Sequence, residues 1–236
     1  MWQVRILTLF PEVFPGPLNY SVTGRAMRNG IYSIEPKSIR DYSEDKHSRI
    51  DDTPYGGGDG MVIKADVLGN AIEGFFLPNG NPVIYLSPRG KVFNQDMAKD
   101  FISKNGLNLI CGRFEGIDER VIQLYKITQV SLGDFLLSCG DVAAFPLLDS
   151  CIRLLPGCLG NPNSAETESF SGGGLLEHPH YTRPRVWRGL EVPSELTSGN
   201  HEGIALWRRR ASEEETMKNR PDIWKRYLEK KNEFAG

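Results

Sequence analysis

The sequence has few cysteines, no long apolar run and little net charge, and each shortage excludes a class of protein. Its four cysteines (Cys111, Cys139, Cys151 and Cys158) are spaced 28, 12 and 7 residues apart, which fits no zinc-binding pattern. No stretch approaches the roughly 18 consecutive apolar residues of a membrane-spanning helix. The opening MWQVRILTLF carries Arg5 and no small-residue cleavage site. We therefore expect an unprocessed cytoplasmic protein without membrane contact, whose cysteines are small buried side chains.

Histidines are equally scarce. The four histidines (His47, His178, His180 and His201) do not form a metal-ligand set, so we expect no metal site among them.

The net charge of the 236 residues is only −2, which does not indicate nucleic-acid binding. From Arg183 onward, however, 12 Lys and Arg face 9 Asp and Glu. This weakly basic end is a hint of a polyanionic partner.

The first 155 residues alternate short β-branched or aromatic runs with helical patterns, which is typical of a layered α/β domain. Asn94 and Asp118 are good helix N-cap residues, and Gly106 lies where a helix C-cap glycine is expected. The predicted strands are Val4–Phe10, Ile31–Ile39, Val83–Ser87, Leu107–Cys111 and Ile127–Leu132, and the predicted helices are Ala65–Phe76, Asn94–Lys104, Asp118–Tyr125 and Val142–Leu154.

The pattern changes after this domain. Residues 156–179 are rich in Gly, Pro, Ser and acids and have little periodicity, as in a linker. Two helices are predicted beyond it, Glu202–Lys218 and Pro221–Phe234, the second with proline in its first turn. We expect an α/β domain over residues 1–158, a flexible linker over 159–178 and a small all-helical domain over 179–236.

Four segments carry possible chemistry. In DDTPYGGGDGM (51–61) the glycines let a backbone approach a ligand closely, although for this segment taken alone a mobile hairpin is the commoner explanation. YLSPRG (85–90), ICGRFEGIDER (110–120) and SLGDFLLSCGD (131–141) each place Gly or Pro just after a predicted strand, where open α/β sheets bind ligands. None has a phosphate-binding signature. Together they favour a pocket of backbone amides and carbonyls suited to a nucleoside.

These segments carry a resemblance. The chain contains LTLFPE, TGRA, DDTPYGGGDGM, YLSP, CGRFEGIDER, SLGDFLLSCGD, RLLPGCLG, SAETESF, HPHYTRP and SGNHEGIALWR in this order. In these motifs it resembles the TrmD family, the bacterial tRNA (guanine-N1)-methyltransferases of the SPOUT class. The resemblance implies a parallel sheet with a C-terminal deep trefoil knot, an exception to the rule against threaded chains. It also implies a homodimer with an active site shared between subunits, and methyl transfer from S-adenosylmethionine to N1 of the guanosine 3′ to the anticodon (position 37).

The resemblance further implies roles for individual residues. Asp51 and Gly60 would lie against the RNA, and the helical domain would bind the tRNA anticodon arm. In CGRFEG, we expect the glycine at 112 to leave room for the adenosyl group. The implied cofactor-binding residues are Ser87, Pro88, Gly112, Glu115, Gly116, Leu132, Gly133, Asp134, Phe135, Leu136, Leu137 and Gly140. The resemblance leaves magnesium open as a further cofactor, but no cluster of Asp and Glu in the sequence locates it.

The implied catalytic pair fits the chemistry. Guanine N1 keeps its proton at neutral pH, so Glu168 would accept this proton while Arg153 stabilises the charge that develops on O6. The chain departs from the family pattern at four positions, with Glu168 for Asp, Phe114 for Tyr, Cys139 for Gly and Asp59 for Pro, and its linker is one residue longer. Two alternatives remain: an RNA-binding dimer that has lost its chemistry, and a methyltransferase for another RNA nucleotide.

Overall fold

A computed structural model describes residues 1–76, 80–160, 168–171 and 174–233 of the chain. The chain divides into two compact units, Met1–Gly160 and Asn161–Gly236. No helix among the described residues is both long enough and apolar enough to cross a membrane.

The first unit is built on a parallel sheet. Five strands, β1 (Trp2–Thr8), β2 (Tyr32–Ser38), β5 (Val83–Val92), β6 (Gly106–Ile110) and β7 (Thr128–Ser131), lie in the order β2-β1-β6-β5-β7. All neighbouring pairs are parallel. This confirms the predicted α/β class with a parallel sheet.

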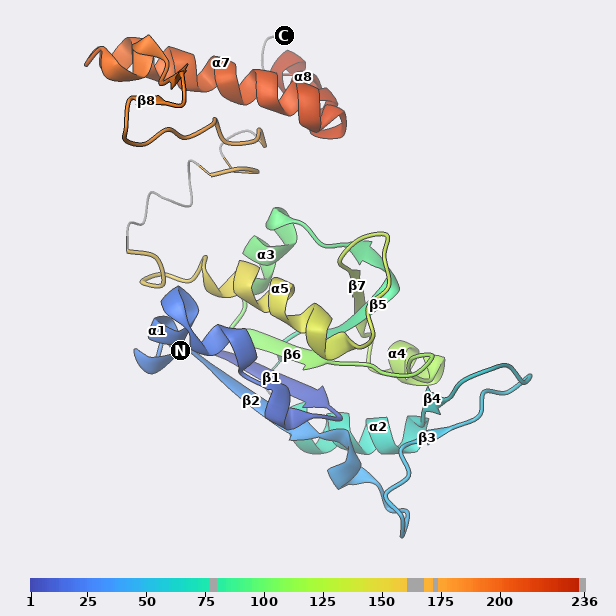
Figure 1. The fold of residues 1–236 in the computed structure, drawn as a ribbon. Helices are drawn as coiled ribbons and strands as arrows, with labels where there is room; N and C mark the ends of the chain where they lie inside the picture. Colours follow the sequence, from blue (N-terminus) through green and yellow to red (C-terminus); the bar gives the residue numbers. More distant parts are fainter. Residues whose placement is uncertain (77–79, 161–167, 172–173, 234–236) are drawn as a thin grey trace. The chain divides into compact units, whose positions relative to one another are not determined.

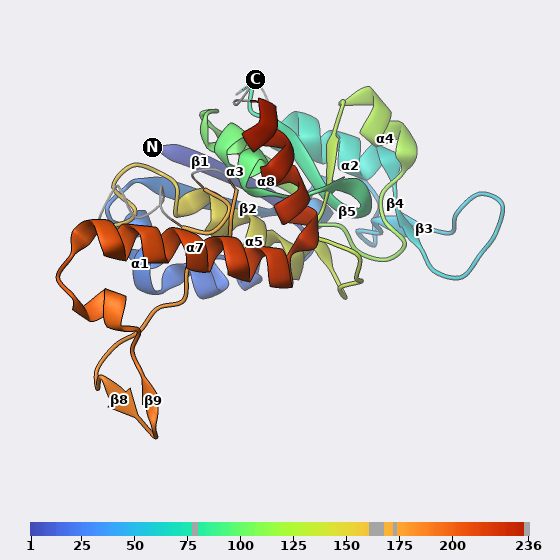
Figure 2. The same cartoon turned by 90° about the horizontal axis from the view of Figure 1, so that it is seen from above.

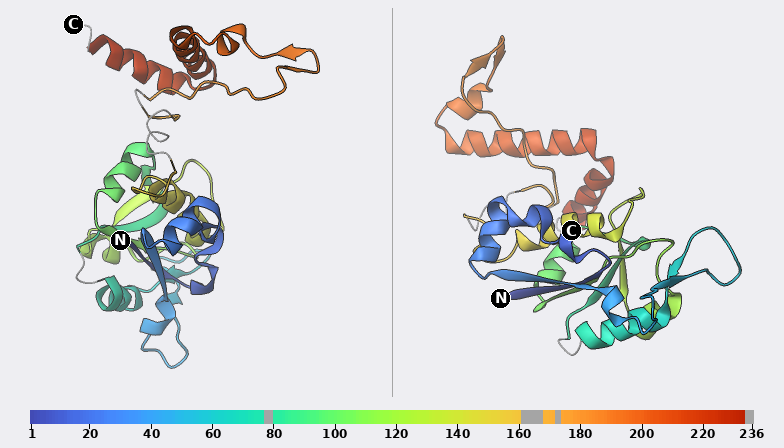
Figure 3. Two further views of the ribbon diagram at one scale, coloured as in Figure 1. Left: turned by 90° about the vertical axis from the view of Figure 1, so that its left-hand side faces the viewer. Right: turned by 60° about the horizontal axis from the view of Figure 1, so that its bottom comes forward.

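Helices cover both faces of this sheet (Figures 1 and 3). The helices α1 (Ser21–Arg28), α3 (Gln95–Ile102) and α5 (Gly140–Ile152) pack on one face, and α2 (Ala65–Ala71), the π-helical turn Ile72–Phe76 and α4 (Glu119–Leu124) pack on the other. Successive side chains of a strand point to opposite faces of the sheet, so one strand contributes to the hydrophobic core on each face. In β5, Ile84 and Leu86 belong to the core under α5, and Tyr85 belongs to the core under α2.

Two predicted helix starts are capped as expected. The side chain of Asn94 accepts a hydrogen bond from the Met97 amide at 2.9 Å, and Asp118 accepts one from the Arg120 amide at 2.9 Å. Helix α1 is absent from the prediction, because it spans only eight residues and no side chain caps its start. It is held instead by burial of Thr23, Gly24 and Ala26.

The second unit contains α7 (His201–Asn219), α8 (Pro221–Glu233), the 3-10 turn Ser194–Thr197 and a small hairpin of β8 (Val186–Trp187) and β9 (Leu190–Glu191), best seen in Figure 2. The expectation of an all-helical domain is wrong at this hairpin. Its physical cause is the two-residue turn, in which Arg188 and Gly189 both have positive φ (52° and 82°). This backbone matches the twist of an antiparallel pair.

Part of the predicted linker is bonded to the helices of the second unit. The Leu176 amide donates to the Thr216 hydroxyl of α7 at 2.9 Å, and the Arg220 guanidinium lies 6.0 Å from the ring centroid of Phe170. The Phe170 amide also donates to the Leu175 carbonyl at 2.9 Å. The SAETESF motif begins at residue 164, so its first part lies outside the described residues.

Candidate active site

A pocket of about 440 Å³ lies at the carboxyl ends of β5, β6 and β7. It is formed by the three strand-end segments that the sequence singled out, together with the start of α5. Eleven of the twelve predicted cofactor residues line it, and Asp134 does not. The lining comprises Tyr85, Leu86, Ser87, Pro88, Arg89, Gly112, Arg113, Phe114, Glu115, Gly116, Val130, Ser131, Leu132, Gly133, Phe135, Leu136, Leu137, Ser138, Cys139, Gly140 and Ala143.

The first wall is a bulge in β5. The predicted strand ends at Ser87, but β5 continues to Val92 because Leu86 and Lys91 both pair with Val130, and residues 87–90 are pushed out of the ladder. Pro88 is tolerated there because a bulge needs no amide donor. A Cβ at Gly90 would lie 2.3 Å from the Val130 nitrogen, so only glycine lets the bulge return to β7.

The second wall is the segment that follows β6. Phe114 and Gly116 both adopt positive φ (59° and 121°), which turns the chain sharply. A Cβ on Gly112 would lie 2.6 Å from Cε2 of Tyr85. The Tyr85 ring is therefore one reason for a glycine at this position, and the expectation that Gly112 also leaves room for the adenosyl group stays a prediction. Burial raises the pKa of Tyr85, so its phenol is neutral at physiological pH.

The third wall connects β7 to α5. Gly133 has φ 143°, and the Ser131 hydroxyl lies 3.2 Å from both the amide and the carbonyl of this glycine. Among the hydrogen bonds between described residues, none is donated by the amides of residues 136–138. These amides are available to a ligand. The Gly140 amide donates to the Gly112 carbonyl at 2.9 Å, which joins the third wall to the second.

A buried polar network supports these walls. Asp141, only 1% exposed, accepts a short hydrogen bond from the Thr8 hydroxyl. Its Oδ2 atom lies 3.6 Å from Nε of Arg113, whose guanidinium covers the ring of Phe10 at 4.4 Å. The Asp141 carboxylate and burial together raise the pKa of the Cys111 thiol. The sequence analysis missed this network because its members are far apart in the chain.

The glycine-rich segment is attached to the pocket wall. It forms the antiparallel pair β3 (Asp51–Asp52) and β4 (Val62–Ile63), with Asp51 half-buried opposite Ile63. The Glu115 amide donates to the Met61 carbonyl at 2.9 Å, and a Cβ on Gly60 would lie 2.6 Å from Cγ of Glu115. Asp51 and Gly60 therefore belong to one hairpin that borders the pocket at Glu115.

The two predicted catalytic residues belong to different units. Arg153 caps the C-terminus of α5 and is half-buried. Glu168 is half-buried in the second unit, where its carbonyl accepts the Ser171 amide at 3.1 Å. Each is described within its own unit, and their pairing stays a prediction.

One further cluster lies in the second unit. Glu177, His178 and His180 each offer one ligand atom, and these atoms all lie within 4.8 Å of one another. The sequence analysis considered histidines alone and expected no metal set, so it missed the carboxylate next to the histidine pair. The signal was present as Glu-His-Pro-His.

Comparison of the sequence with known proteins finds one family and close relatives over nearly the whole chain. Residues 2–226 match the family described as tRNA (Guanine-1)-methyltransferase TrmD. A tRNA (guanine-N(1)-)-methyltransferase of Ruegeria sp. (strain TM1040) is 52% identical over 98% of this chain and 96% of its own length. Another of the same name, from Bartonella bacilliformis, is 53% identical over 96% of each chain. A third, from Ruegeria pomeroyi, is 49% identical over 99% of this chain and 96% of its own. A match over nearly the whole chain, with the motifs YLSP, CGRFEGIDER and SLGDFLLSCGD gathered around one pocket, shows that the protein belongs to the TrmD family.

Proposed function

We propose that this protein transfers a methyl group from S-adenosylmethionine to N1 of a guanosine in tRNA, the one 3′ to the anticodon (position 37). The observation that carries the proposal is the family match over residues 2–226, combined with the pocket that the family motifs line. Fold alone would not support it, because parallel α/β sheets serve many reactions.

The pocket suits the methyl donor. Its volume of about 440 Å³ lies within the range of small-molecule sites. Phe135 and Leu136 offer apolar surface to a purine, and the amides of residues 136–138 offer hydrogen-bond donors to its edge. The bound donor would supply an electrophilic methyl group on its sulfonium sulfur. The implied cofactor role of Asp134 has the least support, because this residue does not line the pocket.

The reaction on guanine needs a base and a cation. Glu168 would accept the N1 proton, and Arg153 would donate hydrogen bonds to O6, where negative charge develops. A carboxylate one methylene longer than the family's aspartate changes the position of the base by on the order of 1 Å, and misplacement of this size costs about a hundredfold in rate. The additional linker residue offers a way for the backbone to compensate.

We further propose a homodimer in which Glu168 of the partner subunit completes the site that holds Arg153. Side chains at and beside the pocket mouth support an interface there, because Phe135 and Leu136 are 55% and 83% exposed. Val142 and Phe114 add further exposed apolar surface next to them. Patches of this kind mark contacts with other chains.

Three finer features complete the proposal. The chain would form the trefoil knot of the family, supported by the hydrogen bond from the Gly140 amide to the Gly112 carbonyl, which brings the segment after β7 back to the segment after β6. The second unit would bind the anticodon arm with its arginines, in the bacterial cytoplasm where tRNA matures. A magnesium requirement would appear as loss of activity after chelation.

Glu168→Gln tests the chemistry. The variant keeps size and hydrogen bonding but removes the base, so we expect the single-turnover rate to fall by about 10² to 10⁴ while affinity for S-adenosylmethionine is unchanged. Glu166→Gln, in the same motif but outside the described residues, is the matched control. Nucleoside digestion and mass spectrometry with labelled donor would locate the methyl group.

The possible outcomes separate the alternatives. Label on N1 of the guanosine at position 37 supports the proposal, and label on another nucleotide would replace the proposed substrate. Binding of tRNA without label would indicate a non-catalytic relative. A wild-type rate in Glu168→Gln with a slow Glu166→Gln would move the base to Glu166.

A further inference from the structure

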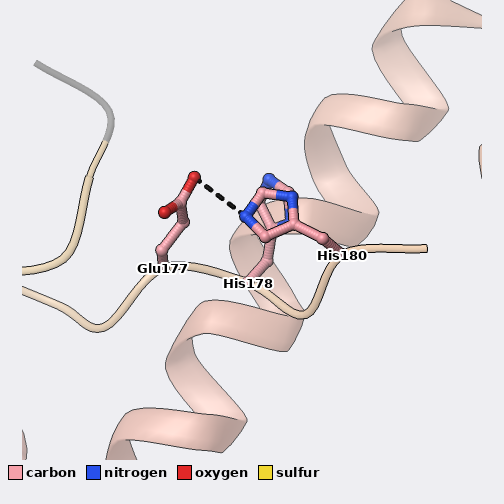
Figure 4. A group of neighbouring side chains, drawn as sticks. All are labelled: Glu177, His178 and His180. Atoms are coloured by element: carbon pink, nitrogen blue, oxygen red, sulfur yellow. Dashed lines mark ion pairs between the residues drawn. The ribbon is translucent and has the colours of Figure 1, made fainter. Parts of the chain in front are cut away.

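The cluster of Glu177, His178 and His180 has the donor set of a metal centre. Figure 4 shows the Glu177 carboxylate directed at the imidazole of His180, with the ring of His178 behind it. The ligand atoms lie within 4.8 Å of one another, and the two imidazole centroids are 4.7 Å apart. Two imidazoles and one carboxylate are ligands that zinc and neighbouring divalent transition metals prefer.

The segment that carries the cluster is held in place by the second unit itself. The ring of His178 packs edge-on against Trp207 of α7 at 6.2 Å, and Tyr181 packs against the same indole at 6.0 Å. The Glu177 amide donates to the Ser169 hydroxyl at 2.9 Å. The backbone on both sides of the cluster is therefore fixed before any ion binds, which lowers the entropy cost of binding.

The hydrogen bonds of the two imidazoles favour metal binding. Nδ1 of His178 lies 3.1 Å from the carbonyl oxygen of Pro179. When Nδ1 donates to this carbonyl, the lone pair of the neutral ring is on Nε2, as in metal-binding histidines whose other nitrogen donates to backbone. Nε2 of His180 lies 3.1 Å from Oε1 of Glu177. An ion between these two atoms would replace the proton that they share.

We propose that Glu177, His178 and His180 bind one divalent transition-metal ion of the zinc, cobalt and nickel class. Metal–nitrogen bonds of about 2.0–2.1 Å require ligand atoms roughly 3–3.5 Å apart, so the cluster must contract slightly. His180, whose side chain is 67% exposed, has the freedom to make this movement. Water would fill the remaining positions, since the cluster lies at the surface. Magnesium is a poor fit, because it prefers oxygen ligands.

The bound ion would act as a local clasp. It would join residues 177 and 180 across Pro179 and thereby reinforce the contacts that already hold the HPHYTRP motif against α7. Because metal binds the folded cluster better than the unfolded chain, it should raise the thermal midpoint of the second unit. The inference does not depend on the proposed function, since it concerns binding that is measured without tRNA or methyl donor.

The experiment titrates the metal-free full-length protein with zinc sulfate by calorimetry and with cobalt chloride by visible absorption. We expect one saturable site per chain, with cobalt bands free of thiolate charge transfer. Glu177→Gln, His178→Ala and His180→Gln should each weaken binding by at least about tenfold. The double variant His47→Ala/His201→Ala is the matched control, because both histidines are exposed and lie outside the cluster. It should bind like wild type.

Two results would overturn the proposal. One is the absence of saturable binding in the wild-type protein, which would reduce the cluster to an ion pair and aromatic contacts. The other is zinc or cobalt binding that persists in His180→Gln and Glu177→Gln but disappears in Cys139→Ser or in His47→Ala/His201→Ala, because the metal would then be bound at a different site. His180→Gln keeps the inference testable if His178→Ala disturbs the Trp207 contact, and circular dichroism verifies that each variant folds.

Discussion

Removal of the Asp141 carboxylate should destabilise the first unit far more than removal of any exposed acid. Asp141→Ala leaves the Thr8 hydroxyl, 0% exposed, without its acceptor, a loss of about 1–3 kcal/mol. It also removes the anion facing Arg113. Breaking a buried ion pair costs roughly 3–5 kcal/mol, but the Arg113 side chain is 31% exposed and water compensates for part of this. We expect a total of about 3 kcal/mol.

Thermal or urea unfolding of the full chain measures this effect. At about 2–4 °C per kcal/mol for a protein of this size, the midpoint of the first unit should fall by about 6–12 °C. Asp149→Ala, an exposed acid on the same helix, is the matched control and should cost about 0.5 kcal/mol or less. In a double-mutant cycle, Thr8→Val and Asp141→Ala should show coupling of about 1 kcal/mol or more. Equal losses in Asp141→Ala and Asp149→Ala would refute the reasoning.

Two other predictions follow from the same unit. Gly140→Ala places a Cβ 2.7 Å from the Gly112 nitrogen, and relief of this clash would require a shift of the backbone. We therefore expect a lower thermal midpoint and, in calorimetry, weaker binding of S-adenosylmethionine. Unchanged values of both quantities would exclude the close approach of the second and third pocket walls. Burial raises the pKa of Tyr32 to about 12, so stability from its neutral phenol is complete below the unfolded value near 10 and is lost as pH rises from 10 to 12. Tyr32→Phe should reduce this alkaline loss in urea titrations at several pH values, and identical pH profiles would contradict it.

Local signals were sufficient to predict most strands and helices. The β-branched and aromatic run Val83–Leu86 and the caps at Asn94 and Asp118 are properties of adjacent residues, so the sequence alone predicts them. The hairpin at Arg188 depends on positive φ at a non-glycine residue, which propensity does not favour. Helix α1 depends on burial by distant segments. This helix is amphipathic, but it is only eight residues long and no side chain caps its start.

The pocket was predicted at the level of segments but not of contacts. Glycines after three strands indicate where a ligand binds, whereas Tyr85 beneath Gly112 becomes visible only when neighbouring strands are aligned. Thr8 and Asp141 are separated by 133 positions, and no periodicity connects them. The predicted pairing of Arg153 with Glu168 would join residues of different units, and no local sequence pattern bears on it.

The attachment of the glycine-rich hairpin to Glu115 has a thermodynamic consequence. The Glu115 amide donates a hydrogen bond to the Met61 carbonyl, and the Ile63 amide donates one to the Gly116 carbonyl at 3.0 Å. The hairpin and the pocket wall are therefore joined by hydrogen bonds between backbone atoms. A ligand that shifts residues 115–116 must therefore also shift the hairpin. If RNA lies against Asp51 and Gly60 as predicted, linkage makes this influence reciprocal: the factor by which an occupied pocket changes the affinity of the hairpin for RNA is also the factor by which bound RNA changes the affinity of the pocket for its ligand.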